Sequence, residues 1–173
     1  AIWQSLFFFF FSSVRLAVDA TAGNGYDTLF LAAHTQPDCR IWALDIQAQA
    51  LEKTKTRLTE AHLEDKVFLC RHSHAELLKV IPEPPDCIVF NLGYLPGGDH
   101  TMTTQAATTL PALGQALQLL RPGGWCSVMM YPGHEAGKME RELLLTWASS
   151  LERTSASVSH WHMVNHQEGA PEL

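Results

Sequence analysis

The sequence predicts an α/β fold, in which a doubly wound, mostly parallel sheet carries helices on both faces. Strand-like runs alternate with helix-like segments along the chain, and this alternation is typical of a parallel sheet covered on both sides. A glycine-containing loop joins the first predicted strand to the first predicted helix. The run 87–90 is apolar without interruption, as expected of a strand buried on both faces.

The first half of the chain contains three predicted strand–helix units. Strands are expected over 14–20, 40–46 and 66–72, and helices over 27–35, 47–63 and 75–81. We expect Asp27 or Thr28 to cap the first helix. Leu51, Leu58 and Ala61 share a helical spacing that predicts the buried side of the second helix.

The second half begins with a proline-rich turn that leads into a fourth strand over 82–92, because its prolines exclude a helix. A helix is expected over 108–120, with Pro111 in its first turn, where a missing N–H costs little. A fifth strand follows over 125–131 and a helix over 135–151. The alternating segment 154–165 predicts a sixth strand that is antiparallel or at the sheet edge.

Length and composition favour one globular domain. The chain has 173 residues, of which 46% are hydrophobic and 17% charged, a balance that argues against disorder. We divide it into an atypical Phe-rich segment, 1–13, and a domain, 14–173. The apolar run 6–11 is shorter than the roughly 18 residues of a membrane span, so no membrane partner is expected. A net charge of −6 does not indicate a nucleic-acid binder, and a local basic patch would have to attract RNA.

The cysteines and histidines do not predict a metal site. Cys39, Cys70, Cys87 and Cys126 form no C-x-x-C pair, so we interpret them as buried thiols of a cytoplasmic protein, or of a plastid or mitochondrial one in a eukaryote. The pairs in "HSH" (72–74) and "HWH" (160–162) complete no four-ligand set.

The loop "DATAGNGYDT" (19–28) predicts a nucleotide-type ligand. Gly23 and Gly25 allow close approach of a ligand to the backbone before a helix N-terminus. Thr28 stands where a dinucleotide fingerprint needs a third small residue, which disfavours an oxidoreductase. Asp19 suits a cationic ligand such as S-adenosylmethionine (SAM), which carries a sulfonium and an ammonium.

Three residues after the next two strands could contact the same ligand. Asp45 lies 22 residues after Gly23 and could bind ribose hydroxyls, or it could cap the helix that begins at Gln47. Ser73 and His74 could contact adenine, or Ser73 could only cap the next helix.

The segment "NLGYLPGGDH" (91–100) follows the fourth strand. Ligands of open α/β sheets bind beyond the carboxyl ends of the strands. There the Asn91 oxygen and the next carbonyl could accept hydrogens from an amine, which turns the nitrogen lone pair toward a sulfonium methyl. Tyr94 would supply an aromatic face, and "NLGY" resembles the [D/N]-P-P-[Y/F/W] motif of amino-directed methyltransferases. The alternative is that Asn91 and Asp99 form turn hydrogen bonds while Tyr94 covers the sheet edge.

Six strings in this chain resemble a known family. They are "DATAGNGYDTLFLA", "ALDIQ", "HSH", "FNLGYLPGGDH", "LLRPGG" and "YPGHEAGKMERE", within residues 17–167. The family comprises small bacterial and plant-organelle proteins labelled "putative rRNA methylases". The resemblance implies the class I (Rossmann-like) SAM-methyltransferase fold. It also implies SAM-dependent methylation of the aminomethyl group of 5-aminomethyl-2-thiouridine, with a tRNA anticodon loop as partner.

Residue roles follow from the resemblance position by position. It implies cofactor contacts from Asp19, Asn24, Asp27, Asp45, Gln47, Ser73 and His74, which join the loop glycines Gly23 and Gly25 as the expected cofactor-binding residues. It implies Asn91 and Tyr94 as catalytic residues and Asp99 as a substrate contact. His134, within "YPGH" (131–134), would bind substrate or cap the following helix.

The ends of the chain depart from the family pattern. Phe-rich residues stand where a helical lead-in is expected, and the last apolar strand, which lies between strands five and six in the class I sheet, is missing. We therefore expect a weakened or rearranged C-terminal edge. Alternative functions are methylation of a small-molecule or protein amine, and SAM binding without activity; a homodimer is left open.

Overall fold

The computed structural model describes residue 4 and residues 8–93 and 104–173. Within these residues the chain forms a five-stranded parallel sheet with the order β3-β2-β1-β4-β5. The strands are β1 (Leu16–Asp19), β2 (Arg40–Leu44), β3 (Val67–Cys70), β4 (Cys87–Asn91) and β5 (Trp125–Met129). The predicted α/β fold is confirmed, and each of these strands lies inside the range expected for it.

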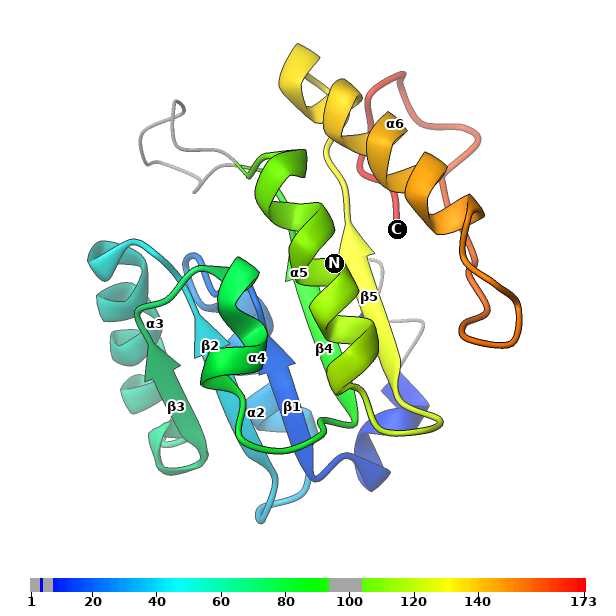
Figure 1. Ribbon diagram of the computed structural model, residues 1–173. Helices are drawn as coiled ribbons and strands as arrows, with labels where there is room; N and C mark the ends of the chain where they lie inside the picture. Colours follow the sequence, from blue (N-terminus) through cyan, green and yellow to red (C-terminus); the bar gives the residue numbers. More distant parts are fainter. Residues whose placement is uncertain (1–3, 5–7, 94–103) are drawn as a thin grey trace.

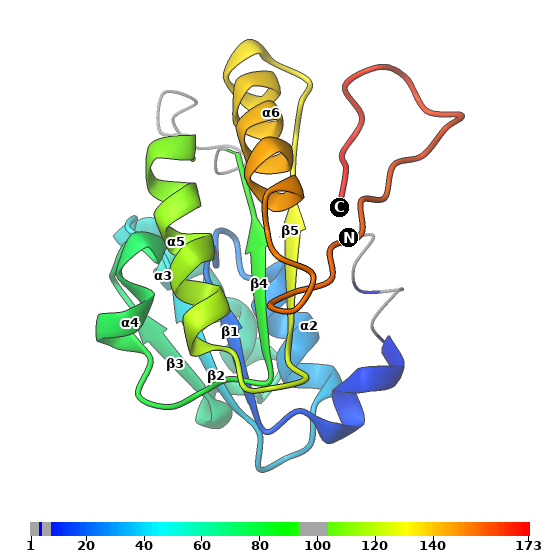
Figure 2. The same cartoon turned by 45° about the vertical axis from the view of Figure 1, so that its right-hand side comes forward.

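Helices alternate with the strands along the chain. The α-helices are α2 (Tyr26–His34), α3 (Ala48–Glu60), α4 (Leu77–Val80), α5 (Ala106–Leu119) and α6 (Glu135–Ser149), and the 3-10 helices are η1 (Phe8–Ser13), η2 (Glu64–Lys66) and η3 (His74–Glu76). Figures 1 and 2 show α4 and α5 on one face of the sheet and α2 and η1 on the other. None of the helices described is long and apolar enough to cross a membrane.

Two apolar clusters form the core, one on each face of the sheet. Alternate residues of β1 and β4 point to opposite faces: Val18 and Ile88 enter one cluster with α4, α5 and α6, while Ala17 and Val89 enter the other with α2 and α3. Phe11 of η1 is buried in the second cluster and packs edge-on against Phe30 and Trp125. The division at residue 13 stays a prediction.

The strand order reverses between β1 and β4. The chain winds outward from β1 through β2 to β3, then returns to place β4 on the other side of β1 and continues to β5. In open parallel sheets the crevice at such a switch point, beyond the carboxyl ends of the strands, is where ligands bind. Asp19 and Asn91 are the last residues of β1 and β4, so the sheet order puts both at this point.

Several local predictions about the helices were wrong. The N-cap of α2 is Gly25, without a side-chain hydrogen bond, rather than Asp27 or Thr28. The buried residues of α3 are Ala50, Thr54 and Leu58, whereas Leu51 is only half-buried and Ala61 is exposed. The apolar spacing did not identify this face because a polar residue, Thr54, lies at its centre. Thr54 can be buried because its hydroxyl is hydrogen-bonded to backbone carbonyls inside the fold.

Two other elements also differ from expectation. Because α5 begins at Ala106, Pro111 lies in its second turn rather than its first. The third helix is a 3-10 turn, η3, followed by the single turn α4.

The predicted sixth strand over 154–165 was wrong. This segment is irregular and largely exposed. In Figure 2 it follows α6 and lies outside the sheet, on the side of its edge strand β5. Met130, just after β5, instead forms an antiparallel bridge with Glu172. Leu173 and Trp161 exchange two backbone hydrogen bonds of 2.6 and 2.9 Å. The residues around Glu172 therefore lie between β5 and the segment at Trp161, in the place expected for the missing last strand. Because they join β5 through an isolated bridge, the edge agrees with the weakened, not the rearranged, alternative.

Candidate functional site

The carboxyl ends of β1, β2 and β4 bring three carboxyl groups and one amide together. Asp19 is fully buried at the end of β1 and Asp27 is 6% exposed in the first turn of α2. Asn91 ends β4, and Asp45 follows β2. The sheet order thus assembles residues that are up to 72 positions apart in the chain, the separation of Asp19 and Asn91.

Asp19 is held by hydrogen bonds inside the protein. Its Oδ2 accepts from the Thr28 hydroxyl at 2.6 Å and its Oδ1 from the Thr21 N–H at 3.1 Å. Thr28, which breaks the dinucleotide fingerprint, is therefore the buried partner of Asp19. The sequence hints at this pairing only by having Thr28 where the dinucleotide fingerprint needs a third small residue.

Burial, and after it the charges of the nearby Asp27 and Asp45 carboxyls, raise the pKa of Asp19 to about 7, against the hydrogen bonds from Thr28 and Thr21, which lower it. A buried carboxyl beside two others makes this end of the sheet electronegative. The site therefore favours a cationic ligand over a pyrophosphate.

Both carboxyl oxygens of Asp45 accept hydrogen bonds from backbone N–H groups. Its Oδ2 accepts from the Gly23 N–H at 2.9 Å, and its Oδ1 accepts from the Gln47 N–H at 2.8 Å. Gln47 is the N-cap residue of α3. The alternative that Asp45 is the N-cap of this helix is therefore wrong: its Oδ1 supports the residue that does cap α3, and its Oδ2 holds the glycine loop. A ribose contact of Asp45 stays a prediction.

The glycine loop packs against α3. Gly25 has φ +80°, and a Cβ there would lie 2.8 Å from the Thr54 Cα. The Thr54 hydroxyl donates to the Gly23 carbonyl at 3.1 Å, and the Arg57 Nε donates to the Asn24 carbonyl at 3.0 Å. Gly25 is therefore required by its backbone conformation and by the closeness of a helix, apart from any ligand.

Ser73 and His74 lie on the neighbouring turn. The Ser73 hydroxyl accepts from the Ala75 N–H at 3.2 Å and caps η3, which is the alternative role considered for it. Burial lowers the pKa of His74, with Asp45 acting in the opposite direction. Its Nε2 lies 3.3 Å from the Thr108 hydroxyl.

Asn91 is fixed at its backbone and at its side chain. Its N–H donates to the Thr21 hydroxyl at 2.6 Å, and its Nδ2 donates to the Asp27 Oδ2 at 2.9 Å. The Asp27 Oδ1 accepts from the Gln4 amide at 2.8 Å. Tyr94 and Asp99, the other residues assigned to this loop, lie outside the described residues.

The turn after β5 completes the rim. Burial and the charge of Asp27 raise the pKa of Tyr131, while a hydrogen bond with the Asn91 side chain lowers it. Tyr131 is thus a neighbour of Asn91, a position for Tyr131 that the sequence did not predict. The His134 Nδ1 accepts from the Gly137 N–H at 3.1 Å and caps α6, so the capping role considered for His134 is the one observed.

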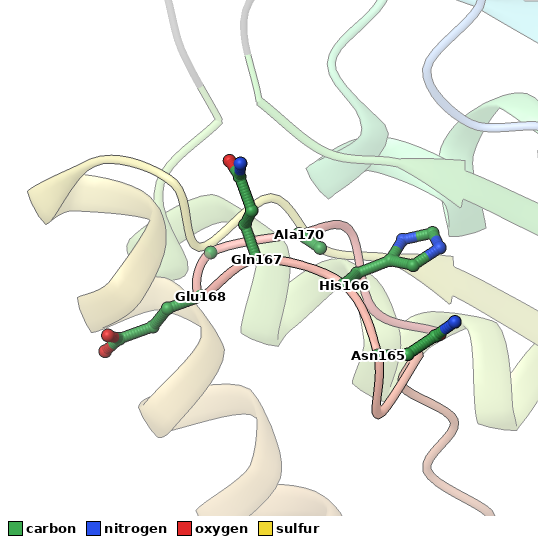
Figure 3. Close-up of a pocket in the computed structure, with 6 residues that line it drawn as sticks. Asn165, His166, Gln167, Glu168 and Ala170 are labelled. Carbon is green, nitrogen blue, oxygen red and sulfur yellow. The ribbon is translucent and has the colours of Figure 1, made fainter.

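A separate hollow of about 490 Å³ lies at the irregular C-terminal segment. Figure 3 shows that its labelled side chains diverge: Gln167 points away from His166 and Asn165. All of its lining comes from residues 165–170, and none of the candidate residues is among them. The backbone of Gly169 in this segment packs closely against Gly133 in the turn after β5.

Comparisons with known proteins point to one family. The family described as "Putative rRNA methylase" matches residues 41–173. A chloroplastic tRNA (mnm(5)s(2)U34)-methyltransferase of Arabidopsis thaliana is 37% identical over 154 residues, which are 83% of this chain and 54% of that protein. The chain therefore spans about half the length of this curated relative.

Two solved structures share the whole fold. A Clostridium thermocellum protein described as a "putative rRNA-methylase" is 34% identical, with a TM-score of 0.94 over 99% of this chain and 92% of that one. A Streptococcus mutans protein described as a "putative methyltransferase", solved in complex with SAH, is also 34% identical, with a TM-score of 0.85 over 97% and 93%.

Proposed function

The chain belongs to the "Putative rRNA methylase" family, and on that premise we propose that it is a SAM-dependent N-methyltransferase whose acceptor is a primary amine on tRNA. The observation that carries the proposal is the position of Asn91 beside the buried Asp19–Asp27 carboxyls at the switch point of the sheet. These groups provide an acceptor for an amine and an electronegative surface for a sulfonium at one place. The S. mutans relative with bound SAH supports the same cofactor.

The cofactor residues proposed are those that line the carboxyl edge: Asp19, Gly23, Asn24, Gly25, Asp27, Asp45, Gln47, Ser73 and His74. Asp19 contributes attraction between its carboxylate and the cationic methionine end. The hydrogen bonds that Asp45 and Thr54 form with the glycine loop hold it in place before a ligand binds. The loop therefore loses less conformational entropy on binding.

Methyl transfer at this site requires a neutral amine held in line with the sulfonium. The amine nitrogen forms the new N–C bond with the methyl group, the S–C bond breaks, and S-adenosylhomocysteine leaves with the electron pair. The methylated ammonium then loses a proton to solvent. Asn91 accepts hydrogens from the amine and orients its lone pair, and positioning of this kind can contribute about 7–11 kcal/mol in favourable systems.

The tRNA acceptor is proposed from the Arabidopsis relative, whose name specifies a wobble-uridine methyltransferase. The aminomethyl group of 5-aminomethyl-2-thiouridine is a primary amine that suits Asn91. Tyr94, Asp99 and His134 are the further substrate contacts proposed. The net charge of −6 favours the second candidate, a small-molecule or protein amine, since RNA binding depends on Lys and Arg contacts to phosphates.

The test is transfer of labelled methyl groups from SAM to tRNA that carries the aminomethyl-thiouridine, compared with the free aminomethyl nucleoside. We expect the tRNA to be methylated and the Asn91→Ala variant to lose at least about 100-fold in kcat while it still binds SAM in calorimetric titration. Gln36→Ala, an exposed amide in the turn before β2, is the control. Equal rates on the nucleoside would support the small-amine candidate, and SAM binding without any transfer would support an inactive binding protein.

A further inference from the structure

We propose that Asp27 is a positioning residue: it orients the side-chain amide of Asn91 so that the oxygen, not the nitrogen, faces the acceptor amine. The inference rests on the proposed function, because it takes Asn91 as the group that accepts hydrogens from the amine. For Asp27, this positioning role replaces the cofactor contact proposed above from the family resemblance.

The geometry joins two elements that are distant in the sequence. The Asn91 Nδ2 donates to the Asp27 Oδ2 at 2.9 Å across 64 positions of the chain. Asp27 is 6% exposed and Asn91 is half-buried, so solvent screens this bond only in part. The backbone of Asn91 is fixed independently by its N–H bond to the Thr21 hydroxyl at 2.6 Å.

The chemistry of the two groups allows one orientation of the amide. An Asn side chain donates from its nitrogen and accepts at its oxygen, whereas an ionised carboxylate only accepts. If the amide turned over, its oxygen would face the Asp27 Oδ2 and two acceptors would meet in a poorly hydrated place. With the nitrogen held by Asp27, the oxygen lies on the opposite edge of the amide.

The other contacts of Asp27 and Asn91 agree with this role. The Asp27 Oδ1 accepts from a second amide nitrogen, that of Gln4, at 2.8 Å, so in this structure both carboxyl oxygens are acceptors for side-chain amides. The Asn91 side chain also lowers the pKa of Tyr131, which places Tyr131 beside the same amide group. Three elements, α2, β4 and the turn after β5, thus converge on one amide group.

The experiment exchanges the two functional groups. In Asp27→Asn the partner of Asn91 can donate as well as accept, so both amide orientations become available. In the double variant Asp27→Asn with Asn91→Asp, the amide at position 27 can donate to the carboxylate at position 91, which leaves an oxygen facing the amine again. Asp38→Asn, an exposed carboxyl in a turn, is the matched control.

We expect kcat at saturating SAM to fall on the order of 10- to 100-fold in Asp27→Asn and in Asn91→Asp, and to recover at least about tenfold in the double variant relative to either single variant. The Kd for SAM should change less than about threefold throughout. Equal kcat in Asp27→Asn and the wild-type protein would overturn the proposal. A loss confined to SAM affinity would also overturn it, and would make Asp27 a cofactor ligand.

A second measurement does not need turnover. The NH2 resonances of Asn91, identified in 15N-labelled protein by their loss in Asn91→Asp, should move upfield in Asp27→Asn because the hydrogen bond to a charged acceptor is lost. Unchanged resonances would contradict the proposal even if the wild-type protein were inactive on tRNA. Inactivity of the wild-type protein on both acceptors, with the resonances shifted, would instead count against the proposed function alone.

Discussion

Asp19 shows how one buried group links stability to ligand choice. It is fully buried, and its pKa is raised from 3.8 to about 7 by burial and by the Asp27 and Asp45 carboxyls. Each unit of pKa corresponds to about 1.4 kcal/mol of preference for the protonated form. Above neutral pH the protein therefore holds a buried carboxylate whose ionised form is unfavourable. A cationic ligand bound nearby would stabilise that ionised form.

The first prediction is a pH dependence of stability. Because the folded-state pKa of Asp19 lies above its unfolded value, the folded protein holds more protons between about pH 4 and 7, and its contribution to the free energy of unfolding falls as pH rises through that window. We expect the melting temperature of the wild-type protein to drop more between pH 5.5 and 8 than that of Asp19→Asn. Asp65→Asn, an exposed carboxyl, should behave as wild type; parallel curves for all three proteins would contradict the assignment.

At the scale of elements, the contact between the glycine loop and α3 sets the shape of the cofactor edge. Gly25 begins α2 with φ +80° and leaves no room for a Cβ against Thr54. The Thr54 hydroxyl in turn bonds to the Gly23 carbonyl. A helix packed this closely holds the loop in its bent conformation.

We predict that Gly25→Ala destabilises the protein by roughly 1–3 kcal/mol, because alanine is strained at positive φ and its Cβ would clash with Thr54. Denaturant unfolding measures the change. Gly114→Ala is the control: this glycine lies within α5, and the Cβ of an alanine there would have open space within 4 Å, so the change should stabilise by about 0.5–1 kcal/mol. Equal effects at both sites would argue against the close packing of the loop.

A second inter-element contact depends on Glu140 of α6. Its side chain is 6% exposed and accepts from the Thr104 hydroxyl at 2.9 Å and from the Thr109 hydroxyl at 2.6 Å. The Thr104 hydroxyl accepts from the Gly93 N–H at 2.7 Å, and the Thr104 N–H donates to the Gly93 carbonyl at 2.9 Å. Glu140 thus joins α6 to the start of α5 and to the chain just after β4.

We expect Glu140→Ala to lower the free energy of unfolding by about 1–3 kcal/mol, because the buried Thr109 hydroxyl and the half-buried Thr104 hydroxyl lose their acceptor. Glu142→Ala, an exposed position on the same helix, should change it by less than about 0.5 kcal/mol. Unfolding in urea compares the two variants. A Glu140→Ala protein as stable as Glu142→Ala would show that the hydroxyls find other partners.

At the scale of the whole molecule, the irregular segment after α6 is attached to the sheet around Glu172. Burial alone would raise the pKa of Glu172, but hydrogen bonds from Arg141 and His160 outweigh it and lower that pKa. Both donors lie 2.7 Å from the Glu172 Oε2. One carboxylate therefore connects α6, the segment at His160 and the edge of β5.

We predict that Glu172→Gln increases hydrogen exchange at the Met130 and Trp161 amides, while exchange in β1 and β4 is unchanged. The same amides should lose protection in the wild-type protein as pH falls through the lowered pKa of Glu172, since the stabilisation depends on its ionised form. Glu168→Gln, an exposed position in the same segment, is the control. Protected amides in Glu172→Gln would show that the backbone bridge alone is sufficient.

The sequence by itself determined the order of the elements, the parallel sheet and the polar residues at the strand ends. Apolar runs such as 87–90 and the loop at Gly23 are local patterns, and local patterns suffice to find strands and their carboxyl ends. Helix caps were harder to predict from the sequence. Asp27 could have been a helix cap or a site residue, and only the structure shows that Gly25 is the cap instead.

The tertiary structure decided which of these residues meet. Strand pairing placed Asp19 beside β4 and joined Asp27 to Asn91, and no local pattern reports a contact across 64 residues. It also decided that 154–165 is not a strand, although its alternation is typical of one, because Glu172 takes the place beside Met130. Hydrogen bonding along a sheet edge is satisfied by whichever segment the whole fold brings there, and periodicity alone does not specify that choice.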